Sequence, residues 1–204
     1  MSGANVVDVG VGPATPADVL AVARHEATVT LSDEAMTAMA GGRAVVEALA
    51  AAPTPAYGIS TGFGALATRH IPTEMRARLQ RSLVRSHAAG SGPEVEREVV
   101  RALMLLRLST LATGRTGVRP ETAALLAGLL THGITPVVRE YGSLGCSGDL
   151  APPSHCALAL MGEGTVRDAT GAELPAAAAL QAAGISPVTL AEKEGLALIN
   201  GTDG

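Results

Sequence analysis

The sequence predicts a mainly α-helical fold with minor β structure. Hydrophobic residues make up 47% of the 204 residues, which is enough for a sizeable core. Aromatic residues make up only 1%, namely Tyr57, Phe63 and Tyr141, so the core must consist of Leu, Val and Ala. Such a core favours closely packed helices. The scarcity of Tyr, Phe and Ile also argues against a sheet-rich fold.

Two helix starts are marked near the N-terminus. Thr15 is a typical N-cap residue, and Pro16 follows at the first helical position. Ser32 is a second cap, and Asp33 and Glu34 follow where acidic residues favour a first helical turn. We therefore expect a weakly patterned segment over 1–14, a helix over 16–25, a short strand over 28–31, a helix to about residue 52 that Gly41-Gly42 weakens, and a loop over 53–64.

The clearest helix is expected from Pro93 and Glu94 to Gly114. Its apolar residues recur at spacings of four, four and three, which is the period of one helix face. Gly114 is a typical helix-ending residue. The apolar face comprises Val95, Val99, Leu103 and Leu106, and the polar complement comprises Glu94, Glu98, Arg101 and Arg107.

The remaining helices begin at capping or proline signals. We expect one from Thr73, one from Pro120 to Gly133, and one from Pro153 to about Met161. Glycine and proline make 134–153 a predicted loop. A hairpin is expected over 165–174 with its turn at Thr170-Gly171, followed by helices near 175–183 and 189–199. The length allows one sizeable core or two small ones.

Charge and composition exclude several classes of protein. The net charge is −4 and the pI is about 5.7, with no basic patch, so nucleic acid is not an expected partner. We find neither a signal peptide nor an apolar run of membrane-spanning length. Two cysteines, Cys146 and Cys156, are too few for a disulfide framework. We therefore expect a cytoplasmic protein without membrane contact.

The most informative segment is 142–152, Gly-Ser-Leu-Gly-Cys-Ser-Gly-Asp-Leu-Ala-Pro. Because Gly148 has no side chain, its backbone nitrogen can approach the carbonyl carbon of Cys146. Bond formation with loss of water would close a five-membered imidazolone. Loss of the Ser147 hydroxyl as a second water would leave an exocyclic methylidene, an electrophile that no standard side chain provides. Taken alone, a Cys-Ser-Gly sequence is most often an ordinary turn.

This segment resembles the signature of the aromatic amino acid ammonia-lyases, which form 4-methylidene-imidazole-5-one from Ala-Ser-Gly. Cys146 stands where Ala is usual, and its side chain is not consumed by ring closure. Three further segments resemble the family in the same order: Tyr-Gly-Ile-Ser-Thr-Gly-Phe-Gly at 57–64, with Ser60 in place of the usual Asn, Arg-Ser-His-Ala-Ala-Gly at 85–90, and Leu-Ile-Asn-Gly-Thr at 198–202.

The resemblance covers nearly the whole chain, but only the first part of the family's longer chain. It implies the N-terminal, electrophile-bearing domain of the aspartase/ammonia-lyase-like helical fold over residues 1–204, without the family's C-terminal helical bundle. It also implies a homotetramer whose active sites combine several subunits.

Roles for individual residues are implied by the same resemblance. Cys146, Ser147 and Gly148 would form the electrophile that captures the substrate amine. Tyr57 would remove the β-proton. An ordinary tyrosine is a weak base at neutral pH, so this role needs surroundings that favour the phenolate, such as the positive end of a helix. Without the flanking matches, Tyr57 would be interpreted as a surface-loop tyrosine.

Three more residues are expected to support the site. His87 would contact the imidazole of the substrate, although a histidine at a helix end can be purely structural. Asn200 would hydrogen-bond the electrophile or its amine adduct, and it could also be a helix C-cap. Asp149 would help ring formation or fix the loop, while an Asp in a glycine-rich turn needs no function.

The implied reaction is the non-oxidative elimination of ammonia from L-histidine to give trans-urocanate. Ser86-His87 resembles the pair associated with histidine specificity, where phenylalanine and tyrosine lyases have Phe-Leu and His-Leu. No external cofactor or metal is expected. The alternatives are a phenylalanine or tyrosine ammonia-lyase or aminomutase with the same electrophile, and a catalytically incompetent truncated lyase domain.

Other kinds of site match the sequence less well. The nucleophile elbow of serine hydrolases needs Gly-x-Ser-x-Gly, and here the second glycine comes one position early. A zinc site from Cys146, His155 and Cys156 lacks a fourth ligand at suitable spacing. We expect His25, His70 and His132 to be solvated, and we interpret Arg76, Arg78, Arg81 and Arg85 as a solvated helix face.

Overall fold

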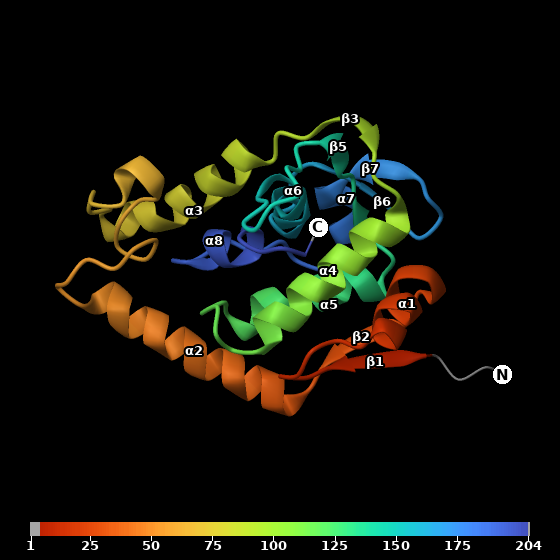
Figure 1. The fold of residues 1–204 in the computed structure, drawn as a ribbon, viewed down its shortest axis with the longest axis horizontal. Coiled ribbons are helices and arrows are strands. Elements are labelled where there is room, and N and C mark those ends of the chain that lie inside the picture. The colour runs from red at the N-terminus through yellow and green to blue at the C-terminus, as the bar shows by residue number, and fades with distance from the viewer. Residues whose placement is uncertain (1–4, 204) are drawn as a thin grey trace.

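The computed structural model describes residues 5–203, and it is mainly helical, as the sequence predicts (Figure 1). Within these residues the helices are α1 (Pro16–His25), α2 (Asp33–Ala51), α3 (Thr73–His87), α4 (Arg97–Ala112), α5 (Pro120–Thr131), α6 (Ala151–Leu160), α7 (Ala176–Ala182) and α8 (Glu194–Ile199), with a 3-10 turn η1 (Gly64–Leu66). The strands are β1 (Val6–Val9), β2 (Thr28–Leu31), β3 (Ser91–Glu94), β4 (Thr135–Pro136), β5 (Arg139–Tyr141), β6 (Thr165–Arg167) and β7 (Glu173–Pro175).

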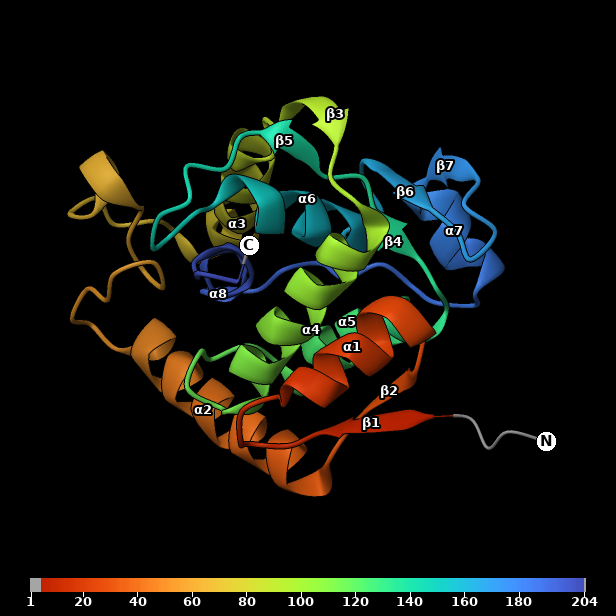
Figure 2. The same cartoon turned by 45° about the vertical axis from the view of Figure 1, so that its right-hand side comes forward.

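Helix α4 lies at the centre of the hydrophobic core. It contacts α1, α2, α5, α6 and α8, and Figure 2 shows it between α1 and α6. Its buried side chains include Met104, Leu105, Leu108 and Leu111, which are fully or almost fully inaccessible to solvent. Packing around a central helix of aliphatic residues is what the lack of aromatic residues predicts.

The predicted boundaries and polar face of α4 are wrong in part. The helix begins at Arg97 rather than at Pro93, because residues 91–94 form β3 and pair antiparallel with β5. Val99, placed on the apolar face, is 46% exposed. Arg101 and Arg107, predicted as polar complement, are 0% and 3% exposed. Neighbouring elements surround α4, so these guanidinium groups bind backbone carbonyls instead of water.

The β structure is minor and consists of short pairs. Strand β1 was not predicted within 1–14. It pairs in parallel with β2 and has buried valines at alternate positions. The hairpin of β6 and β7 is confirmed, with its turn at 168–171. The predicted loop over 134–153 also contains β4, β5 and the start of α6, because each strand finds its partner elsewhere in the chain.

Local signals at helix ends are mostly confirmed. Thr15 forms a capping box with Asp18, and the Ser32 side chain accepts a hydrogen bond from the Ala35 amide. Gly133 follows α5 with a positive φ of 66°. Helix α8 is shorter than predicted and begins at Glu194, after an extended segment. No helix within residues 5–203 is both long and apolar enough to cross a membrane.

Helices α3, α6 and α8 pack against one another, and this arrangement positions the candidate site. Figure 1 shows α8 between α3 and the central helix α4. His87 is the last residue of α3, and Asn200 is the C-cap of α8. The segment 142–150 leads directly into α6. Three of the four motifs therefore lie at the ends of helices that touch one another.

Candidate active site

The Cys-Ser-Gly segment lies in an exposed loop before α6. Cys146 and Ser147 are exposed, and Gly148 is half-buried. Gly145 and Gly148 have φ values of 62° and 75°, in the left-handed region that glycine adopts without strain. The loop therefore turns sharply on both sides of Cys146-Ser147, which keeps the two peptide units at its tip.

The buried side chain of Asp149 binds residues at the start of this loop. Its carboxylate is buried at 6% exposure, and Oδ2 accepts hydrogen bonds from the Ser143 hydroxyl, from the Leu144 amide at 3.2 Å and from the Gly145 amide at 3.3 Å. Three donors satisfy the buried charge, as burial of an ionised group requires. The contacts fit the loop-fixing role considered for Asp149.

The turn after α8 is bonded directly to the loop. The carbonyl oxygen of Gly201 accepts hydrogen bonds from the Gly148 amide at 3.0 Å and from the Asp149 amide at 3.2 Å. Asn200 is the C-cap of α8, with its backbone amide bonded to Leu196. Its Oδ1 would lie 3.2 Å from a Cβ added to Gly148, so the amide side chain rests against this glycine.

His87 ends α3 with its imidazole oriented by backbone. Nδ1 lies 2.9 Å from the Leu83 carbonyl oxygen and 3.0 Å from the Ser86 hydroxyl oxygen. A carbonyl oxygen only accepts, so the proton of the neutral ring is on Nδ1. Nε2 is then the acceptor of the half-buried ring.

The segment after His87 packs on the start of the loop. A Cβ added to Gly142 would lie 3.1 Å from Cα of Gly90, and Ser91 pairs with Tyr141 in the adjoining strands. The Gly90 amide donates to Nε2 of His155 at 3.0 Å. Burial lowers the pKa of His155, which keeps this acceptor unprotonated.

Tyr57 lies in a separate loop and is 53% exposed. Its hydroxyl oxygen accepts a hydrogen bond of 3.3 Å from the Gly64 amide, the first residue of η1. Its ring meets Phe63 edge-on, with centroids 6.0 Å apart. A Cβ at Gly58 would lie 3.4 Å from Cδ2 of Leu196, so the loop rests on α8. The Tyr57 loop is also bonded to the segment just before α3, because the Ile71 amide donates to the Ser60 carbonyl oxygen at 2.9 Å.

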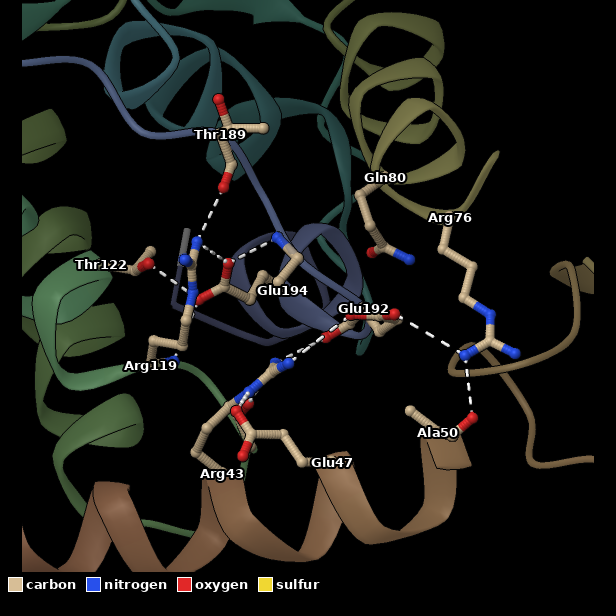
Figure 3. Close-up of polar contacts among 12 residues, drawn as sticks. Arg43, Glu47, Ala50, Arg76, Gln80, Arg119, Thr122, Thr189, Glu192 and Glu194 are labelled. Carbon is tan, nitrogen blue, oxygen red and sulfur yellow. Dashed lines mark hydrogen bonds and ion pairs between the residues drawn. The ribbon is translucent and has the colours of Figure 1, made fainter. Parts of the chain in front are cut away.

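A buried polar cluster anchors the start of α8, and sequence reasoning missed it (Figure 3). Glu194 is 0% exposed. Its Oε1 accepts from the Arg119 amide at 3.0 Å and the Thr122 hydroxyl at 2.7 Å. Its Oε2 accepts from Nη2 of Arg119 and from the Ala191 amide, at 2.7 and 2.8 Å. Charged residues carry no periodic signal that distinguishes such burial from exposure.

The same cluster corrects the interpretation of Arg76. This residue was assigned to a solvated face, but it is 5% exposed and donates to the Ala50 carbonyl oxygen at 2.9 Å. Glu192 lies 3.6 Å from both Arg76 and Arg43, and so ties α3 and α2 to the segment before α8. Arg81 and Arg85, by contrast, are exposed and pair with Glu163.

The second cysteine is unsuited to chemistry. Cys156 is buried in α6, and burial raises the pKa of its thiol to about 12, so it is protonated at neutral pH. Over residues 5–203 there is no group of three or more His, Cys, Asp and Glu side chains that could hold a metal ion.

Comparison with known proteins shows the family of this chain. The family model "Aromatic amino acid lyase" matches residues 14–204, and the chain belongs to this family. A histidine ammonia-lyase of Streptomyces coelicolor is 66% identical over 98% of this chain. The chain spans 39% of the length of that relative.

Two solved structures are similar in fold over nearly the whole chain. A tyrosine aminomutase from Streptomyces globisporus matches with a TM-score of 0.89 and 41% identity, over 97% of this chain and 37% of its own. A histidine ammonia-lyase from Trypanosoma cruzi matches with a TM-score of 0.88 and 35% identity, over 97% of this chain and 38% of its own.

Proposed function

We propose that this chain contributes to the non-oxidative deamination of L-histidine to trans-urocanate and ammonia. The observation that carries the proposal is the direct bonding of the Cys-Ser-Gly loop to the Asn200-Gly201 turn, with the His87 segment packed on the same loop. The 66% identity to a relative named histidine ammonia-lyase favours histidine over tyrosine or phenylalanine.

The loop residues fit a 4-methylidene-imidazole-5-one formed from Cys146, Ser147 and Gly148. Ring closure needs a residue without a side chain at the attacking nitrogen, and a Cβ at Gly148 would crowd Asn200 at 3.2 Å. It also needs a loop held by contacts outside the tripeptide, which Asp149 and Gly201 provide. When present, this group supplies an electrophilic carbon for the substrate amine.

The protein side chains then bind and orient the substrate. Nε2 of His87 is an acceptor suited to the imidazole N–H of histidine. Tyr57 takes the β-proton, and the Gly64 amide, which donates to its hydroxyl oxygen, holds that oxygen in place. Asn200, which lies against Gly148, hydrogen-bonds the electrophile or the bound amine.

Assembly is part of the same proposal. Leu144 is 84% exposed in the Cys-Ser-Gly loop, and Tyr57 is 53% exposed in the loop that rests on α8. Exposed apolar side chains beside a site are the kind of surface that a second subunit covers. We propose a cytoplasmic homotetramer in which neighbouring subunits complete the site around L-histidine.

The first test is the intact mass of the purified chain, with peptide mapping across 142–153. We expect a chain two waters lighter than its sequence, with the loss in Cys146-Ser147-Gly148. Ser147→Ala is the control, because without the hydroxyl the methylidene cannot form. A parent chain of unmodified mass would contradict self-formation of the electrophile by this chain.

The substrate assignment is tested separately with His87→Phe in an assay for urocanate. We expect the Michaelis constant for histidine to rise, while His132→Phe, at an exposed histidine that ends α5 rather than α3, leaves it unchanged. An unchanged Michaelis constant in His87→Phe would show that the imidazole pocket lies elsewhere.

A further inference from the structure

Arg107 on α4 holds the turn that binds the Cys-Ser-Gly loop. Its side chain is buried, and Nη1 donates to the carbonyl oxygens of Asn200 at 3.1 Å and Ala197 at 3.4 Å. Nη2 pairs with the Asp203 carboxylate. A Cβ at Gly201 would overlap the guanidinium, so the backbone of the turn lies directly against the cation.

The turn that Arg107 holds is bonded to the backbone nitrogen of Gly148, the atom that must attack in ring closure. The carbonyl oxygen of Gly201 accepts hydrogen bonds from the Gly148 amide at 3.0 Å and from the Asp149 amide at 3.2 Å. These bonds fix the plane of the peptide that carries the Gly148 nitrogen. Arg107 therefore reaches the reacting nitrogen through one turn of backbone, without touching the loop itself.

We propose that Arg107 is a positioning residue for ring closure, acting through the Gly201 carbonyl on the Gly148 amide. The inference rests on the proposed formation of the electrophile. It assigns a task to a buried cation in a part of α4 that otherwise packs in an aliphatic core. A cation buried at a cost in desolvation is well explained when it fixes one conformation of a functional loop.

The chemistry of closure makes this position significant. A bond forms between the Gly148 nitrogen and the Cys146 carbonyl carbon. The Cys146 oxygen leaves as water with the protons of the Gly148 and Ser147 nitrogens. The Ser147 hydroxyl leaves as the second water with the Cα hydrogen of the same residue. Closure thus removes the Gly148 N–H that Gly201 holds, and the Asp149 amide keeps the loop attached to the turn.

Before closure, the Gly201 oxygen does two things. It keeps the Gly148 peptide in one orientation. By accepting the hydrogen bond it also polarises the N–H bond, which leaves more electron density on the nitrogen and makes it a better nucleophile. Both effects depend on the position of one carbonyl. A displacement of the turn by about 1 Å can slow an oriented reaction by roughly a hundredfold.

The test measures the rate of mass loss rather than activity. Parent and variant chains are made by cell-free translation and sampled over time. Mass spectrometry of the intact chain then measures the loss of two waters. Arg107→Met removes the donors and keeps a long apolar side chain. Arg101→Met is the matched control, since Arg101 is also buried on α4 and donates to two carbonyl oxygens, of Val22 and Leu130, away from the loop.

We expect Arg107→Met to lose its waters about tenfold to a hundredfold more slowly than the parent, and Arg101→Met to keep the parent rate. Arg107→Lys, which retains charge and donors, should recover part of the rate. Circular dichroism and melting temperature verify folding of each variant. If Arg107→Met does not fold, a folded Arg107→Gln, which is uncharged and too short to keep all three guanidinium contacts, is compared with the parent.

Three results would overturn the inference. A folded Arg107→Met that matures as fast as Arg101→Met would remove the positioning role while leaving the proposed function intact. If Arg107→Gln is the variant that folds, maturation at the parent rate has the same meaning. A parent chain that never loses the two waters would overturn the proposed electrophile, and with it this inference.

Discussion

Replacing Glu194 by Gln tests whether the buried cluster at the start of α8 stabilises the fold. The carboxylate is fully buried, and each of its oxygens accepts two hydrogen bonds. Glutamine has almost the same shape but replaces one oxygen by an NH2 group. Two of the four donors then face another donor, so they lose their acceptor.

The magnitude follows from those two donors. A buried donor left without a partner costs about 1–3 kcal/mol, which gives roughly 2–6 kcal/mol for the pair. The side chain of Arg119 is 26% exposed, so its guanidinium can regain some hydration. We therefore expect Glu194→Gln to lower the free energy of unfolding by about 2–4 kcal/mol, a large part of the total for a domain.

Urea unfolding followed by circular dichroism measures this change. Glu47→Gln is the control in the same cluster, because Glu47 also pairs with an arginine, Arg43, but its side chain is 62% exposed. An exposed ion pair contributes less than about 1 kcal/mol. If Glu194→Gln costs no more than Glu47→Gln, the reasoning about buried donors at α8 is wrong.

Three further predictions concern the thiols, a histidine and the core. Iodoacetamide should label Cys146 in the folded chain and Cys156 only after denaturation, since burial raises the pKa of Cys156 to about 12; two rapidly labelled thiols would contradict this. Burial lowers the pKa of His155 from 6.5, so the unfolded chain binds its proton more readily, and the stability associated with this group is complete above pH 6.5 and lost as the pH falls toward the folded pKa. The fall in unfolding free energy below pH 6.5 should therefore be shallower in His155→Gln, and an identical pH slope would refute it. Leu108→Ala should cost about 2–5 kcal/mol in urea unfolding, because Leu108 is 0% exposed, whereas Leu20→Ala at 47% exposure should cost far less; equal costs would show that α4 is not the core helix.

Features that depend on neighbouring residues were predicted well. The caps at Thr15 and Ser32 and the turn at Gly133 involve partners within a few positions, so composition and spacing suffice to find them. The fold class follows from the supply of Leu, Val and Ala, because their packing favours helices whatever their final neighbours are. The chemistry expected of Cys146-Ser147-Gly148 is also local, since all atoms of the expected ring come from adjacent residues, and it stays a prediction.

Features that depend on distant partners were missed or misplaced. Strand β1 needs β2 beside it, and β3 needs β5, so neither can be identified from its own residues. Arg76, Arg101 and Arg107 have the spacing of solvated side chains, yet they are buried because backbone carbonyls elsewhere in the chain accept their hydrogen bonds. Periodicity records polarity, and it does not record whether a polar group has found a partner.

The sequence by itself determined the helical class, the local helix ends and the presence of the tripeptide that is expected to close a ring. Only the tertiary structure decided that Gly201 holds the Gly148 amide, that Asp149 is buried against its loop, and that α3, α6 and α8 pack against one another. The physical reason is that the atoms of the expected ring belong to adjacent residues, which the sequence gives directly. The orientation of those atoms is fixed by hydrogen bonds from segments far away in the chain.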